Sequence, residues 1–514
     1  MLARAHAFTI DGLHTRHVSV EVDVRPGLPG FAIVGLADAA VREARERVTA
    51  AIINSGFEFP ARRITANLAP GDVRKAGPGL DLALSCAVLA AAGQLPPQEL
   101  ERVALFGELA LDGTVRASRG ALAIAHAAQR SGMRALVLAP ACAHEAQLID
   151  GLEVIAAARL RSAVRVLSGG AGDAPAEPAR GGRREPATGA DDGMAGGDLS
   201  DVRGQHHAVN ASVIAAAGAH NLLLSGPPGT GKTMLAQRIA SILPPLTSAE
   251  AVEVTRIHSL LGQRVDALAQ TRPFRAPHHS ITAAGLVGGA SRGSVGEVVL
   301  AHNGVLFLDE LSEFARPTLE ALRQPLEDGR VAIVRARHSA VYPTRFMLLA
   351  ATNPCPCGFA GEGDMCDCGE ADMARHRRRL SGPLLDRIDL LSTLHRELAH
   401  DPHAPSFTSS ARASEQVASA RARQAARLRE EGVAVNAHMD ARMLRRHVRL
   451  DDRGQEMLRA AKQRGLLSAR GEHRVLRVAR TIADLDSSDR VRARDLGAAL
   501  ALRPEPNAAG NRVA

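Results

Sequence analysis

The apolar positions of this chain follow two patterns that predict different secondary structure. Short continuous apolar runs at 222–224, 305–308 and 347–351 are typical of strands buried in a parallel sheet. After about residue 396 these runs disappear and apolar residues recur at helical spacing. The pattern there predicts helices at 411–432, 439–447, 452–464, 471–486 and 490–502. We therefore expect an α/β core followed by a helical domain.

The first 167 residues mix both kinds of element. Strict alternation of apolar and polar residues predicts a half-buried strand at 18–24, and helices are expected at 39–53 and 81–92. Apolar runs at 134–140 and 154–156 predict buried strands. This part of the chain is therefore expected to be an α/β module of its own.

A segment with almost no large apolar residue separates the two halves. Residues 168–198 consist mainly of Gly, Ala, Pro, Asp and Arg, which is the composition of a flexible linker. The expected division is an N-terminal domain at 1–167, a linker at 168–198, a core at 199–395 and a helical lid at 396–514.

A phosphate-binding loop lies between the first core strand and a helix. The eight residues fit G-x-x-x-x-G-K-[ST] and are Gly226, Pro227, Pro228, Gly229, Thr230, Gly231, Lys232 and Thr233. Glycines allow the backbone to approach phosphates, and N–H groups at a helix start attract anions. The chain has only three lysines, Lys75, Lys232 and Lys462. A lysine in this loop supplies the compact ammonium that phosphate binding needs, which predicts a nucleoside-triphosphate site.

Two carboxylates follow the apolar run at 305–308. Asp309 is expected to hold Mg²⁺ together with the hydroxyl of Thr233, and Glu310 to orient and deprotonate the attacking water. An apolar run that ends in Asp-Glu is a weak signal alone. About 70 residues after a phosphate-binding loop it becomes a strong one.

Asn353 and Arg387 are the next candidates along the chain. Asn353 ends the run at 347–352 and is expected to act as a sensor of the γ-phosphate, in preference to merely beginning a turn. The residues alone do not decide the role of Arg387. It either reaches a nucleotide across a subunit boundary or pairs with Asp386 or Asp389.

Arg470 opens a lid helix and is a candidate second sensor of the nucleotide. Arg474 and Arg477 lie one and two turns further on, and a solvated lid arginine is the alternative for each of the three.

Four of the six cysteines lie within 14 positions. Cys355, Cys357, Cys366 and Cys368 form CxC-x8-CxC and can supply four thiolates to a tetrahedral zinc site. This spacing is tighter than the usual CxxC pairs, and a reduced, metal-free loop is the alternative.

The segment from 329 to 345 alternates apolar and polar residues and predicts a β-hairpin. Arg335, Arg337 and His338 would lie at its tip. They are candidate contacts to DNA phosphates, and a solvated hairpin face is the alternative.

Composition narrows the class of partner. The net charge is +8, which favours an anionic partner, while aromatic residues are only 2% and argue against base stacking as the main contact. No apolar run reaches the length of a membrane span, and no signal-peptide pattern opens the chain. We therefore expect a cytoplasmic protein without a membrane partner.

These motifs, in this order, closely resemble the YifB/ComM family of magnesium-chelatase-like AAA+ proteins. The likeness covers nearly the whole chain except the linker. It is carried by the phosphate-binding loop and by the segments 201–205, 272–279, 301–310, 353–358, 380–387 and 478–485.

The resemblance implies an AAA+ P-loop α/β core of the magnesium-chelatase type with a helical lid. It also implies an arginine finger at Arg387 and a second sensor at Arg470. Family inserts would map to about 272–298 and 327–345. The implied activity is that of a homo-hexameric, ATP-hydrolysing motor on single-stranded or branched DNA that drives branch migration in natural transformation.

The N-terminal module resembles the protease domain of Lon, which has a ribosomal-S5-like fold. Gly77, Pro78 and Gly79 stand where the Lon-type Gly-Pro-Ser nucleophile would be, and 122–124 contain no partner lysine. Proteolysis is therefore not expected, because acyl transfer has neither nucleophile nor base. The main alternative to a DNA motor is a remodelling ATPase that binds a protein partner through this module.

Overall fold

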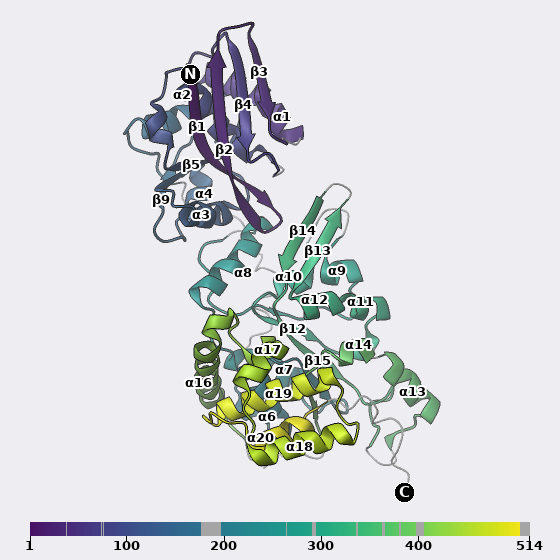
Figure 1. Ribbon diagram of the computed structural model, residues 1–514. Helices are drawn as coiled ribbons and strands as arrows, with labels where there is room; N and C mark the ends of the chain where they lie inside the picture. Colours follow the sequence, from purple (N-terminus) through teal and green to yellow (C-terminus); the bar gives the residue numbers. More distant parts are fainter. Residues whose placement is uncertain are drawn as a thin grey trace. The chain divides into compact units, whose positions relative to one another are not determined.

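The computed structural model describes residues 1–36, 39–72, 75, 77–175, 197–263, 265–289, 295–335, 338–361, 365–379, 382–396 and 406–503 (Figure 1). Residues 176–196, most of the expected linker, lie outside this set. The chain forms two compact units. The first comprises Met1–Arg184 with Ser248–Ala269 and Ala336–Val341, and the second comprises the remaining residues.

The first unit is built on a mixed seven-stranded sheet with the order β3-β4-β2-β1-β5-β8-β9. Strands β1, β2 and β4 are antiparallel neighbours, whereas β1, β5, β8 and β9 run parallel. The strands are β1 (Leu2–Asp11), β2 (His14–Arg25), β3 (Gly30–Val34), β4 (Arg63–Ala69), β5 (Val103–Phe106), β8 (Ala135–Leu138) and β9 (Glu153–Ala156).

The core of this unit lies between the sheet and its helices. Every residue of α2 (Asp81–Ala91) is buried, and α2 packs against β1 and β2. This follows from its sequence, which is almost entirely apolar. The other helices are α1 (Ala39–Asn54), α3 (Ala121–Arg130), α4 (Pro140–Ala146) and α5 (Leu160–Leu167), and β6 (Glu108–Leu109) and β7 (Val115–Arg116) form a small ribbon.

Several elements of this unit were not expected from the sequence, among them β1 and α8. Strand β1 buries Ala3, Ala5 and Ala7, and alanine is a weak strand signal. Helix α8 (Ser248–Leu260) follows the phosphate-binding helix in sequence, yet it packs on α3. There Ser259 donates a hydrogen bond to Glu145. The sequence division assigned this segment to the core at 199–395, and the domain limits remain a prediction.

The second unit contains a five-stranded parallel sheet with the order β11-β12-β15-β10-β16. Its strands are β10 (Leu222–Ser225), β11 (Phe274–Arg275), β12 (Val305–Leu308), β15 (Met347–Thr352) and β16 (Leu390–Thr393). All residues of β12 and β15 are buried, as their continuous apolar runs predict. The register pairs Ser225, the end of β10, with Thr352 on β15.

Helix α6 (His206–Gly218) packs on β10 and β16, and α7 (Lys232–Ile242) packs on β15. Six further helices belong to this part of the chain. They are α9 (Ala283–Val287), α10 (Glu297–Leu300), α11 (Arg316–Ala321), α12 (Arg323–Asp328), α13 (Glu370–Arg379) and α14 (Gly382–Leu385). A separate two-stranded sheet joins β13 (Arg330–Arg335) to β14 (His338–Pro343), so the expected hairpin is confirmed.

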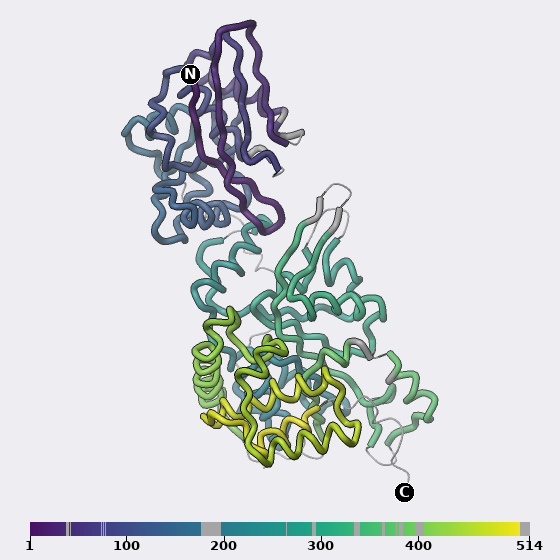
Figure 2. The backbone as a smooth tube through the Cα atoms, viewed as in Figure 1, coloured from purple at the N-terminus to yellow at the C-terminus, as the bar shows by residue number. Residues whose placement is uncertain are grey.

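The lid is helical, as the sequence predicts. It contains α16 (Ser410–Leu428), α17 (Ala441–His447), α18 (Asp452–Gln463), α19 (Ala469–Leu485) and α20 (Ala493–Ala501), drawn in green to yellow in Figure 2. Ser409, Asp440, Asp451 and Ser468 each cap a helix by accepting a backbone N–H, which fixes four of these starts. Helix α16 packs on α6 and α7, and α19 packs on α6. No helix in the described ranges is long and apolar enough to span a membrane.

Candidate nucleotide site

The phosphate-binding loop connects the end of β10 to the start of α7. Ser225 ends the strand and Lys232 begins the helix. Gly229 and Gly231 have φ values of 77° and 88°, a region that side chains other than glycine rarely adopt. The first N–H groups of a helix have no partner within it. The loop thus places free backbone donors where an anion can be bound.

Lys232 is held at this loop by oxygen atoms. Its Nζ donates to the carbonyl oxygens of Gly226 at 2.6 Å and Pro227 at 2.8 Å, and to Oδ1 of Asn353 at 3.1 Å. Burial lowers the pKa of Lys232, and the nearby charges of Asp309 and Glu310 oppose that shift. A phosphate oxygen is an acceptor of the same kind, so the ammonium is already positioned for a nucleotide.

Thr233 and Asp309 form the corner expected to hold magnesium. Thr233 Oγ1 donates to Asp309 Oδ2 at 2.7 Å, across from α7 to the end of β12. Mg²⁺ prefers oxygen ligands and is bound through one or two carboxylates plus substrate phosphates. A hydroxyl and a carboxylate at this separation fit that ion.

Glu310 adopts an unusual backbone conformation directly after Asp309. Its φ is 51°, in the left-handed region, and its N–H donates to Asp309 Oδ1 at 3.0 Å. A non-glycine residue held there costs on the order of 1 kcal/mol, and such residues cluster at active sites. The carboxylate is 56% exposed and lies 3.7 Å from Nδ1 of His279. His279 was not expected from the sequence as a partner of Glu310.

Asn353 follows β15, which lies between β10 and β12 in the sheet. Its Oδ1 accepts from Lys232, and its backbone carbonyl accepts from His376 Nε2 at 2.9 Å. His376 is buried and belongs to α13. The sequence alone did not reveal this contact, because it depends on the path of the loop between β15 and α13.

Arg387 is mostly buried within its own chain. Its side chain is 9% exposed and pairs with Glu327. Asn221 Nδ2 donates to the Arg387 carbonyl at 2.8 Å, which ties this turn to the start of β10. The structure therefore gives Arg387 a partner on α12, and the role of an arginine finger stays a prediction.

The three lid arginines differ in their surroundings. Arg470 is 73% exposed and lies 3.9 Å from Glu327, the residue that also binds Arg387. Arg474 donates to the carbonyl of Ile388 at 2.9 Å, and Arg477 donates to that of Met439 at 2.8 Å. Arg474 and Arg477 thus bind backbone of their own unit. Arg470 is the exposed one, and its role as second sensor remains a prediction.

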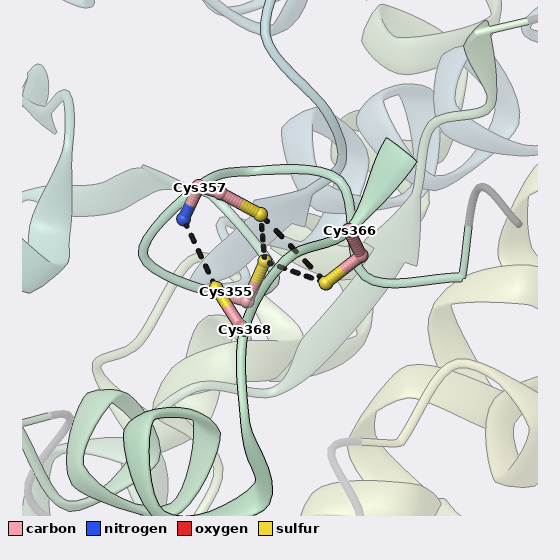
Figure 3. Close-up of side chains that lie close together, drawn as sticks. All are labelled: Cys355, Cys357, Cys366 and Cys368. Carbon is pink, nitrogen blue, oxygen red and sulfur yellow. Dashed lines mark hydrogen bonds between the residues drawn. The ribbon is translucent and has the colours of Figure 1, made fainter. Parts of the chain in front are cut away.

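The four cysteines of the CxC-x8-CxC pattern converge (Figure 3). Sγ of Cys355 lies 3.3 Å from that of Cys357 and 3.8 Å from that of Cys366, and Cys357 and Cys366 are 3.7 Å apart. Cys368 Sγ accepts the Cys357 N–H at 3.4 Å. A tetrahedral site with metal–sulfur bonds of about 2.3 Å places its sulfurs about 3.8 Å apart. The cluster can therefore hold a metal ion.

Two of the three hairpin residues proposed to contact DNA belong to described strands. Arg335 ends β13 and His338 begins β14. Arg337 lies outside the described residues, and DNA contact by all three stays a prediction.

The N-terminal unit offers a different environment where the Lon-type nucleophile would lie. A Cβ atom added to Gly79 would come within 2.5 Å of the Phe106 ring, so there is little room for a serine there. Lys75 is buried and donates to the Pro70 carbonyl. Ser85 lies within α2, whose residues are all buried. The absence of proteolysis stays an expectation.

Comparison with known proteins agrees with this architecture. The family model described as magnesium chelatase, subunit ChlI, matches 198–401. Models described as subunit ChlI of Mg-chelatase and as the ChlI C-terminal region match 20–141 and 407–503.

Among curated relatives, YifB of Escherichia coli is 42% identical over 508 residues, covering 98% of this chain and 97% of its own. Competence protein ComM of Haemophilus influenzae is 40% identical over 496 residues, covering 96% and 95%. A Holliday junction branch migration complex subunit, RuvB of Paenarthrobacter aurescens, is 30% identical over 210 residues, covering 37% of this chain and 49% of its own.

The chain belongs to the YifB/ComM family of magnesium-chelatase-like AAA proteins. The predicted fold class is confirmed: a mixed α/β N-terminal domain, a parallel five-stranded core and a helical C-terminal domain. Membership of this family implies ATP hydrolysis with ATP and Mg²⁺.

Proposed function

We propose that this protein is a ring-forming ATPase that moves branched or single-stranded DNA, as a ComM-like branch-migration motor. The observation that carries the ATPase part is the convergence of Lys232, Asp309 and Asn353 at the carboxyl ends of three adjacent parallel strands. The DNA part is supported by the 40% identity to ComM over 96% of the chain. The partial likeness to a branch-migration subunit and the net charge of +8 also support it.

In this proposal each residue of the site has a separate task. The backbone of 226–233 and the Lys232 ammonium bind the phosphates, and Thr233 and Asp309 hold Mg²⁺, which neutralises charge on the β- and γ-phosphates. Glu310 accepts the proton of the attacking water, because its carboxylate is exposed and it directly follows Asp309 in the chain. Asn353 donates through its amide nitrogen to the γ-phosphate, since its oxygen is already bound by Lys232.

A second subunit completes the site in this proposal. Arg387 would leave Glu327 and stabilise the phosphoryl group bound by the neighbouring chain of a homo-hexamer. Arg470 would contact the nucleotide of its own chain, since it is the exposed lid arginine. The shared attachment of both arginines to Glu327 supports a linked movement of lid and finger.

Two further assignments belong to the proposal. The hairpin residues Arg335, Arg337 and His338 contact DNA phosphates, which is the chemistry expected of cations at a hairpin tip. The four cysteines bind zinc, because closely spaced thiolates favour a tetrahedral soft-ligand site.

A second candidate is an ATPase that remodels a protein partner through the N-terminal unit. All three family models carry the description of a magnesium chelatase subunit, which favours it. The two candidates differ in what stimulates hydrolysis.

The discriminating experiment measures ATP turnover by the purified full chain alone, with a single-stranded oligonucleotide and with a four-way junction. The DNA motor predicts stimulation by DNA and branch migration of the junction. Turnover that ignores DNA, with no binding at low salt, would count for the protein-remodelling alternative instead. Glu310→Gln is the matched control, because it should bind ATP and junction without moving the junction.

A further inference from the structure

The loop that carries the four cysteines begins at the nucleotide site itself. Asn353 directly follows the end of β15, and Cys355 lies two positions after Asn353. Cys368 lies two positions before α13. The cysteine pairs therefore occupy the two ends of the connection between β15 and the helix that carries His376.

Both ends of this connection contact the nucleotide site. At one end, a Cβ added to Gly358 would lie 2.6 Å from Cδ of Pro228, so the cysteine loop touches the phosphate-binding loop. At the other end, buried His376 binds the Asn353 carbonyl at 2.9 Å. Asn353 is thus held from three sides: by Lys232 on its amide oxygen, by His376 on its carbonyl and by the covalent connection to Cys355.

The described part of the loop has little hydrophobic support of its own. Cys355 is fully buried, but Cys357, Cys366 and Cys368 are only partly buried. The backbone N–H groups of Ala360 and Cys357 donate to Sγ of Cys355 and Cys368 at 3.2 and 3.4 Å, an arrangement that stabilises thiolates. Small segments of this kind take their order from a bound metal rather than from apolar burial.

We infer that the metal held by the four cysteines acts as a brace that positions Asn353 against the phosphate-binding loop, and so makes ATP hydrolysis depend on the metal. This inference rests on the proposed ATPase function. Nucleotide binding itself should survive metal loss, because Lys232 and Thr233 belong to α7 and the phosphate-binding loop is anchored at its two ends by β10 and α7. Asn353 and the cysteine loop act on the hydrolytic step.

The test compares Cys366→Ser with wild type and with Cys142→Ser, which changes a buried cysteine outside the cluster. Three quantities are measured on the full chain: zinc per chain, the Kd for a non-hydrolysable ATP analogue and ATP turnover. For Cys366→Ser we expect zinc to fall from about one equivalent to below about a fifth. We expect the Kd to stay within about threefold and turnover to drop at least about tenfold, the effect of losing one transition-state contact. Hydrogen exchange at 353–361 should become faster in this variant alone.

Two variants that keep all four thiols guard against a folding defect. Gly358→Ala should push the loop away from Pro228, and His376→Gln should release the Asn353 carbonyl. Both should keep zinc and ATP-analogue affinity and lose turnover at least about threefold, a smaller effect because the metal still orders the loop.

Several results would overturn the brace. One is a wild-type protein with less than half an equivalent of metal per chain. The others are normal ATP turnover by metal-free Cys366→Ser, or normal turnover by both Gly358→Ala and His376→Gln. DNA-indifferent turnover by wild type would reject the proposed motor and leave the brace standing.

Discussion

The two sheets of this protein place very different side chains at the carboxyl ends of their parallel strands. In the first unit, β5, β8 and β9 run into Gly107, Ala139 and Ala157, whose side chains are no larger than a methyl group. In the second unit, the corresponding edge carries the phosphate-binding loop after β10, Asp309 and Glu310 after β12, and Asn353 after β15.

This difference indicates that the first sheet serves packing, whereas the second sheet carries the reactive groups. Ligands bind parallel α/β sheets at the carboxyl edge, provided that polar groups are collected there. In the first unit the ends of β5, β8 and β9 lack such groups, and buried Asp81 is paired with Arg47 at 2.7 Å inside the protein. We therefore expect changes in the second unit to alter turnover and changes in the first unit to alter stability.

The largest expected effect comes from Arg387, the proposed arginine finger of the second unit. Arg387→Ala should lower ATP turnover about 10³-fold, because a finger stabilises charge on the transferred phosphoryl group. The measurement is steady-state ATPase activity, with Arg316→Ala, an exposed arginine on α11, as the control.

Mixing tests whether this arginine acts in trans. Inactive Arg387→Ala chains combined with inactive Glu310→Gln chains should regain part of the turnover, because one kind of mixed interface has an intact Glu310 and an intact Arg387. If mixtures stay inactive while mixed rings form, the arginine does not act across a subunit boundary.

The next effect concerns the buried pair of the first unit. Asp81→Asn leaves Arg47 without its charged partner, and breaking such a pair costs about 3–5 kcal/mol. Denaturant unfolding should show this loss, whereas Glu46→Gln, in the exposed pair with Arg45, should change stability by less than about 1 kcal/mol. A direct loss of turnover in folded Asp81→Asn chains would break the division between the two sheets.

The same comparison explains what the sequence could and could not predict. The carboxyl-edge residues 309, 310 and 353 were predictable, because continuous apolar runs mark buried parallel strands and their polar ends must meet at one edge. The chain path outside the sheet was not. The contact between His376 and Asn353 joins the two ends of the cysteine loop. Helix α8 lies within the core in sequence but packs on α3. Neither contact has a periodic signal, because both depend on tertiary packing.

A smaller effect is expected from His279, which lies 3.7 Å from the Glu310 carboxylate. Both side chains are substantially exposed, so their interaction is worth at most about 1 kcal/mol, which is about fivefold in rate. His279→Ala should therefore lower turnover up to about fivefold without weakening ATP binding. His207→Ala, an exposed histidine on α6, serves as the control. A loss beyond about 100-fold would show that His279 has a larger task than positioning.

The smallest effect is a pH dependence that comes from a histidine pair of the first unit. His6 Nδ1 and His17 Nε2 are 2.8 Å apart, and burial lowers the pKa of both imidazoles below their usual 6.5. The unfolded chain therefore takes up protons first, so stability is complete above pH 6.5 and declines as the pH falls below it. Unfolding midpoints measured across this range should show the decline, and His17→Gln should reduce it. An unchanged midpoint in wild type would contradict the prediction.

The central claim is that the polar edge of the second sheet couples ATP hydrolysis to DNA. The most direct measurement is ATP turnover and junction movement by the purified chain, with and without a labelled four-way junction. We predict that the junction stimulates ATP turnover and that the protein converts it to separated duplexes only when ATP is present. The Glu310→Gln variant should bind ATP but neither hydrolyse it nor separate the junction. Turnover unaffected by any DNA, with the junction left intact, would contradict the account.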